Sequence, residues 1–73
     1  MAQIVVTAGI DVSKPRLDVE IWPIRQQISV DRDASGLATL IIWLTEHGVP
    51  RVGLEASGGY ERLVIDTLQD AGF

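Results

Sequence analysis

The 73-residue chain contains no cysteine and a single histidine, His47. Disulfide bonds and thiolate metal sites are therefore excluded, and so is a zinc site built from cysteine and histidine. A Ser-His-Asp triad would depend on His47 alone. Its place near the end of an expected helix favours a structural role at the helix dipole.

Basic residues are also scarce, with six Lys and Arg against ten Asp and Glu and a net charge of -4. A nucleic-acid-binding surface normally carries a basic patch, so this balance has the wrong sign for binding nucleic acid unaided. No apolar run approaches the roughly 20 residues of a membrane span, and the N-terminus lacks the basic start of a signal peptide. We therefore expect a cytoplasmic domain with no membrane contact.

The composition that remains is that of a folded domain, since 47% of the residues are hydrophobic and 22% are charged. A domain of this size buries only about 60% of its unfolded surface, which leaves a thin margin of stability. No repeat, linker or low-complexity tract interrupts the sequence. Residues 1–73 are accordingly interpreted as one unit.

The first part of the chain has the period of β-strands. Residues 4–12 form an apolar face made of Ile4, Val6, Ala8, Ile10 and Val12. Val5 on the opposite side indicates a central strand that is covered on both faces. Residues 17–22 and 27–31 alternate apolar and polar side chains, which predicts an antiparallel meander of three strands.

The period then changes to that of a helix, whose apolar face is formed by Leu37, Leu40, Ile41 and Leu44. Either Asp33 or Ser35 caps its start, and Gly48 ends it. Residues 51–55 predict a fourth strand, and a second helix with an apolar stripe from Tyr60 to Ala71 ends at Gly72. The order is βββαβα, and a right-handed crossover makes the fourth strand parallel to its neighbour.

Two carboxylates stand apart from the other acids. Asp11 lies near the end of the most apolar strand, and Glu55 closes the fourth strand directly after Leu54. Carboxylates in apolar surroundings are costly unless they are paired or bound to a cation. If the two strands are adjacent and parallel, these side chains begin about 5 Å apart, and their all-oxygen chemistry selects Mg²⁺ or Mn²⁺. The alternative is that Asp11 caps a turn and Glu55 caps the second helix.

The remaining acids fall on expected polar faces or at the ends of elements, where solvation is the default. They include Asp18, Glu20, Asp66 and Asp70. A two-metal site needs more than two carboxylates, and the pattern offers no convincing third.

Two blocks of sequence resemble one known family. Residues 9–14 (Gly-Ile-Asp-Val-Ser-Lys), followed by Leu-Asp-Val at 17–19, resemble the opening of the DEDD transposases of insertion sequences. This is the IS-one-ten group, which includes the Piv-type DNA invertases. Residues 53–61 are similar to the Glu-Ala-Thr-Gly-Gly-Tyr-Glu signature of that family, with Ser57 in the place of Thr. The capped helix between the blocks, with its Trp43-Leu44 pair, also matches.

The resemblance implies a ribonuclease-H-like, RuvC-like fold in an α/β chain. Three strands would be antiparallel and the fourth would lie parallel beside the first. It implies that Asp11 and Glu55 are the first two catalytic and metal-binding members of a DEDD tetrad that holds two Mg²⁺ ions. The family's two later aspartates lie beyond the region that matches Phe73. Residues 1–73 would then be the N-terminal part of one catalytic domain, ending before its fifth strand and inactive alone.

The resemblance further implies that the full-length protein recombines DNA in transposition, with an RNA guiding target choice in characterised members. Ser13 and Lys14 are candidate phosphate contacts, although a turn hydrogen bond and a solvated lysine are the alternatives. Two other functions stay open. One is an actin-like ATPase or sugar-kinase fragment, which usually has glycine where Ser13 stands, and the other is a non-catalytic interaction remnant.

The resemblance also bears on self-association. If the chain ends before a fifth strand, residues 51–55 form an unpaired apolar edge, and such an edge invites pairing with another chain. We therefore expect a homo-oligomer through the edge of the fourth strand.

Overall fold

The computed structural model describes residues 6–56 and 59–73. Its elements follow the predicted order. The strands are β1 (Thr7–Val12), β2 (Arg16–Trp22), β3 (Gln26–Asp31) and β4 (Arg51–Ala56), and the helices are α1 (Ala34–Glu46) and α2 (Glu61–Asp70). Ile4, Val5, Ser57 and Gly58, on which parts of the sequence interpretation depend, lie outside the described residues.

The four strands form one mixed sheet in the order β3-β2-β1-β4. β1 pairs antiparallel with β2 and parallel with β4, and β2 pairs antiparallel with β3. The predicted meander and the predicted parallel fourth strand are therefore confirmed. The crossover from β3 through α1 returns the chain to the far side of β1, which brings two segments separated by about forty residues side by side.

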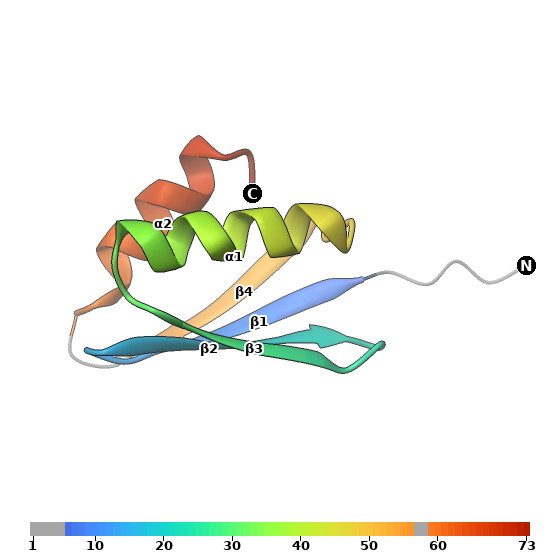
Figure 1. Ribbon diagram of the computed structural model, residues 1–73, viewed down its shortest axis with the longest axis horizontal. Coiled ribbons are helices and arrows are strands. Elements are labelled where there is room, and N and C mark those ends of the chain that lie inside the picture. The colour runs from blue at the N-terminus through green and yellow to red at the C-terminus, as the bar shows by residue number, and fades with distance from the viewer. Residues whose placement is uncertain (1–5, 57–58) are drawn as a thin grey trace, which may run out of the picture.

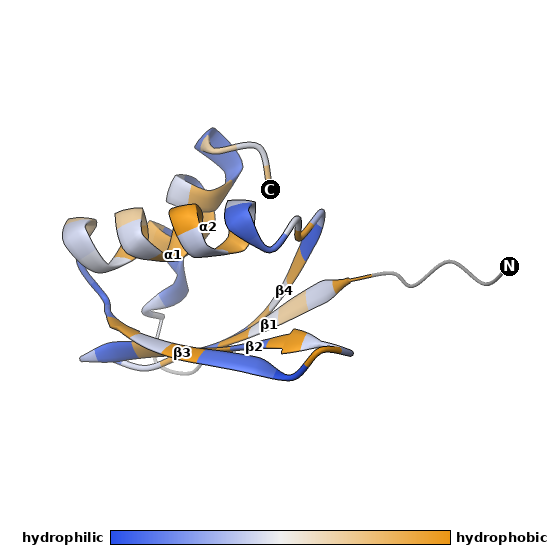
Figure 2. Ribbon diagram, turned by 45° about the vertical axis from the view of Figure 1, so that its right-hand side comes forward, coloured by the Kyte–Doolittle hydropathy of each residue, from blue (hydrophilic) through white to orange (hydrophobic). Residues whose placement is uncertain are grey.

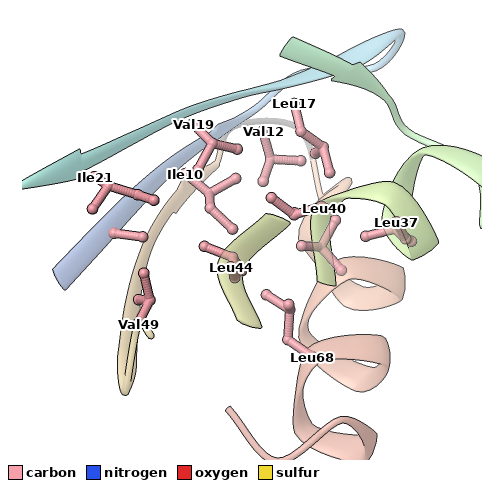
Figure 3. Close-up of a cluster of buried hydrophobic side chains, with 12 residues drawn as sticks. Ile10, Val12, Leu17, Val19, Ile21, Leu37, Leu40, Leu44, Val49 and Leu68 are labelled. Atoms are coloured by element: carbon pink, nitrogen blue, oxygen red, sulfur yellow. The ribbon is translucent and has the colours of Figure 1, made fainter. Parts of the chain in front are cut away.

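Both helices lie on one face of the sheet (Figure 1). Side chains from β1, β2 and both helices, together with Val49 from the segment before β4, point toward one another in the core (Figure 3). The buried hydrophobic residues are Ala8, Ile10, Val12, Leu17, Val19, Ile21, Leu37, Leu40, Leu44, Val49, Val64 and Leu68. No polar or charged side chain is buried among the described residues. The core is thus a single apolar layer between the sheet and the helices.

The opposite face of the sheet is open, which corrects one expectation. β1 is central, but Thr7, Gly9 and Asp11 on its other side are exposed, so this strand is covered on one face only. The apolar Val5 suggested a second cover, whereas the strand's other described residues on that side are small or polar. Hydrophobic and hydrophilic residues alternate along β3 in the same way (Figure 2).

Helix α1 begins at a defined cap. Asp33 is the N-cap, and its Oδ1 accepts a 2.7 Å hydrogen bond from the backbone N–H of Gly36. Of the two predicted caps, Asp33 is therefore correct and Ser35 is not. Gly48 follows the helix with a positive φ of 65°, a conformation that favours glycine, as predicted for its end.

Helix α2 is shorter than its predicted apolar stripe. Val64 and Leu68 are buried and Tyr60 packs against the core, but Ala71 lies beyond the helix and is exposed. Gly72 ends the segment with a φ of 93°. Among the described residues, neither helix is long and apolar enough to cross a membrane.

Candidate functional site

Asp11 and Glu55 are direct partners across the parallel pair of β1 and β4. Ile10 and Leu54, the residues before them, are also partners and face the helices. Because side chains alternate along a strand, Asp11 and Glu55 both project from the open face. Neighbouring strands lie about 4.8 Å apart, so the two side chains begin at roughly that separation. The predicted juxtaposition of these residues is confirmed.

A third carboxylate lies in the same row across the sheet. Asp18 on β2 is the antiparallel partner of Asp11, so the row runs Ser29, Asp18, Asp11, Glu55 from β3 to β4. Interpretation of the sequence assigned Asp18 to a solvated face and missed this neighbour. The register of the β1–β2 hairpin could have revealed this neighbour, because pairing Val12 with Leu17 places Asp11 opposite Asp18.

The acids of β2 and those of the β1–β4 pair differ in their hydrogen bonds. Ser29 Oγ donates to Asp18 Oδ1 at 2.5 Å, and Gln27 Nε2 donates to Glu20 Oε2 at 3.2 Å. Within residues 6–56 and 59–73, no side-chain hydrogen bond involves Asp11 or Glu55. Among the described residues, both oxygens of Asp11 and of Glu55 are therefore without a side-chain partner, whereas Asp18 and Glu20 each have one oxygen engaged.

The open face forms a broad depression of about 720 Å³. Its lining runs across all four strands and includes Asp11, Asp18, Glu20 and Glu55. Gly9 and Gly53 lie next to each other in the row below the carboxylates and carry no side chain to fill the floor. The depression is thus acidic, shallow and open to a large ligand.

The electrostatics of this face favour a cation. Like charges on side chains that begin on neighbouring strands repel each other, weakly in water and more strongly where the protein limits solvent access. A divalent cation between them removes this repulsion, and carboxylate oxygens are the ligands that Mg²⁺ and Mn²⁺ prefer. No group of three or more metal-ligating side chains is close enough to hold an ion among the described residues. Asp11 and Glu55 can therefore supply two ligands, with water or further groups completing the shell.

Ser13 and Lys14 lie in the turn between β1 and β2, and neither belongs to the lining of the depression. The Ser13 hydroxyl donates to the backbone oxygen of Arg16 at 3.0 Å, so it would have to give up this bond to donate to a phosphate. The Lys14 side chain is exposed, and its backbone oxygen accepts a 2.8 Å hydrogen bond from Arg32 Nε. Ser13 thus makes the hydrogen bond within the turn that was one of its two expected roles. A contact between Lys14 and a phosphate stays a prediction.

The aromatic rings that contact arginines, and His47, have structural surroundings. Arg32 lies over the ring of Tyr60 at 5.0 Å, and Arg25 lies over Trp22 at 4.3 Å. His47 Nδ1 is 2.8 Å from the backbone oxygen of Trp43, at the end of α1. This placement agrees with the structural role that the sequence indicated for the histidine.

Comparison with known proteins adds no assignment. The sequence matches no protein-family model and no curated protein.

Proposed function

We propose that this chain is the N-terminal part of a metal-dependent DNA transposase or recombinase with a ribonuclease-H-like fold. In this proposal Asp11 and Glu55 hold one face of a Mg²⁺ or Mn²⁺ site. DNA, and an RNA guide in the full-length protein, would be the partners. The observation that carries the proposal is the register of β1 and β4, which makes Asp11 and Glu55 direct partners on an open, acidic face.

The topology supports the proposed fold. The sheet order β3-β2-β1-β4, with β1 parallel to β4, is the arrangement that the resemblance to the DEDD transposases implies. Both motif blocks of that resemblance contribute one carboxylate each to the pair. The register of β1 and β4 thus supports the pair that the resemblance implies.

The chemistry of the residues fits a divalent cation. The two carboxylates are exposed, share one row and engage no other described side chain, so they are free to bind a hard cation. When bound, such an ion polarises a phosphoryl oxygen and lowers the pKa of a bound water. In this proposal, the role of the chain is to position the ion at the carboxyl ends of β1 and β4. Two ligands alone predict weak binding, with a Kd of about a millimolar.

The proposal is tested by titrating the 73-residue chain with Mn²⁺ in a calorimeter. We expect binding that is lost in Asp11→Asn and in Glu55→Gln, because each variant keeps the side-chain shape and removes one charge. Asp66→Asn is the matched control, since Asp66 is an exposed acid on α2, away from the open face. Affinity that is equal in all four proteins would contradict the proposed site.

The nucleotide-binding alternative makes a different prediction. An actin-like ATPase or sugar kinase would hold a phosphate against the turn of the first hairpin, where the Ser13 hydroxyl is already hydrogen bonded to Arg16. Binding of a non-hydrolysable ATP analogue that survives Asp11→Asn would favour that function over the recombinase.

A further inference from the structure

Arg32 joins the two segments of chain that follow the candidate cation ligands. It lies between β3 and α1. Its Nε donates a 2.8 Å hydrogen bond to the backbone oxygen of Lys14, in the turn that follows Asp11 along the chain. Its guanidinium carbon lies 5.0 Å from the centre of the Tyr60 ring, at the start of α2, which follows Glu55 along the chain. One side chain therefore connects the chain beyond β1 with the chain beyond β4.

The two ends of this connection differ in how firmly they are held. The Tyr60 ring is partly buried and packs against the hydrophobic core, whereas Lys14 and Pro15 in the turn are exposed. The backbone N–H of Arg32 also donates to the backbone oxygen of Pro15, at 3.3 Å. These three contacts, to Lys14, Pro15 and Tyr60, form the Arg32 tie. Through it, an exposed turn is held by two hydrogen bonds to a residue that itself rests on a ring packed in the core.

The Arg32 tie lies at the end of the sheet that carries the two carboxylates. The turn after β1 and the starts of α1 and α2 share this end of the molecule, opposite the turn between β2 and β3 (Figure 1). Asp11 and Glu55 are each the last residue but one of their strands, and the ends of elements are where local opening begins most readily. A contact between the segments just beyond the strands therefore limits how far these two side chains can separate.

We propose that Arg32 is a positioning residue for the cation site of Asp11 and Glu55. The Arg32 tie joins the turn after β1 to the start of α2 and so keeps the two carboxylates at a separation that one ion can bridge. A guanidinium is itself positive and always charged, so Arg32 is not a ligand and acts through the segments that it joins. This role rests on the proposed metal site, whereas the tie itself is a property of the metal-free chain.

Substitutions at Tyr60 test the tie in the metal-free chain. Tyr60→Leu keeps an apolar side chain in the core but removes the aromatic face that Arg32 contacts, whereas Tyr60→Phe keeps that face. The readout is hydrogen exchange, by nuclear magnetic resonance, of the Ser13 and Arg32 amides, which donate to the backbone oxygens of Arg16 and Pro15. Relative to the core amides, we expect both to exchange about threefold faster in Tyr60→Leu and at the natural rate in Tyr60→Phe.

Arg25→Gln is the matched control for this experiment. Arg25 also lies over an aromatic ring, that of Trp22, but in the turn at the opposite end of the sheet. Its loss is expected to leave the Ser13 and Arg32 amides unchanged. Unchanged exchange of these two amides in Tyr60→Leu would overturn the tie. Equally faster exchange of all amides, the core included, would overturn it too, because that pattern reports a less stable fold and no local connection.

The positioning role is read from the Mn²⁺ affinity of the 73-residue chain, with circular dichroism to verify that each variant is folded. We expect Tyr60→Leu and Arg32→Gln to bind Mn²⁺ about threefold more weakly than the natural chain, and Tyr60→Phe and Arg25→Gln to bind it equally well. The sign in Arg32→Gln is informative, because removal of a positive charge by itself favours the binding of a cation.

The outcomes separate this role from the proposed function. If the natural chain binds Mn²⁺ and both Tyr60→Leu and Arg32→Gln bind it equally well or more tightly, the positioning role is overturned and the metal site stands. If the natural chain binds no Mn²⁺ while the exchange pattern is as expected, the proposed function fails and Arg32 is a structural tie only.

Discussion

Gly36 lies where the first turn of α1 passes closest to the end of β3. A Cβ built on this glycine would come within 1.9 Å of the backbone oxygen of Asp31. Since this neighbour is backbone, the contact cannot be relieved by rotating a side chain. Glycine is therefore required here for close approach and not for an unusual φ.

The Gly36→Ala substitution is accordingly expected to destabilise the fold by about 1–3 kcal/mol, the range for forcing extra volume into a packed site. The measurement is the free energy of unfolding in urea. In an unhindered helix position the same substitution stabilises by about 0.5–1 kcal/mol. The sign of the change in unfolding free energy therefore shows whether the close approach to Asp31 exists. Gly9→Ala is the control, because nothing lies within 4 Å of a Cβ at that position.

Asp33 carries a second prediction at this helix end. Its carboxylate accepts the Gly36 N–H, so Asp33→Ala leaves that donor without its partner and is expected to cost about 1 kcal/mol. Asp33→Asn keeps an acceptor oxygen and is expected to recover most of this loss. Thermal unfolding of the two variants makes the comparison, and equal stability of both would argue against the cap.

Helix α1 has one face buried in the core and another exposed to solvent. Leu44 is fully buried, whereas Ile42, two residues earlier, is 59% exposed. Leu44→Ala is expected to destabilise by about 2–5 kcal/mol, because it removes buried methyl groups and leaves a cavity. Ile42→Ala is expected to change the stability by no more than about 0.5 kcal/mol. Unfolding in urea distinguishes them, and similar losses would contradict the placement of this helix on the sheet.

The elements were the most predictable part of the molecule. Local periodicity predicts the strands and helices because buried side chains recur at fixed intervals within each element. Examples are the alternation of Leu17, Val19 and Ile21 and the helical spacing of Leu37, Leu40 and Leu44. The open face of β1 was not predictable from Val5 alone, since covering that face requires an element that local periodicity does not reveal. The Asp18 neighbour was missed because cross-strand register depends on the hairpin as a whole.

At the scale of the molecule, one layer of helices leaves the opposite sheet face free, and four of the ten acids line a depression there. Asp11, Asp18, Glu20 and Glu55 make this depression negatively charged. An acidic face repels a nucleic-acid backbone unless a cation intervenes. Under the proposed recombinase function, DNA binding would therefore require an ion held by Asp11 and Glu55 and basic groups from outside this face.

The central claim is that Asp11 and Glu55 form one cation site on the open face, and nuclear magnetic resonance tests it most directly. Mn²⁺ broadens the amide signals of residues close to it. Titration of the isotope-labelled chain is expected to broaden the signals of Asp11 and Glu55 first and to leave those of Asp66 and Asp70 on α2 sharp. In Asp11→Asn the broadening at Glu55 is expected to be lost. Broadening that begins at α2, or that persists at Glu55 in Asp11→Asn, would contradict the account.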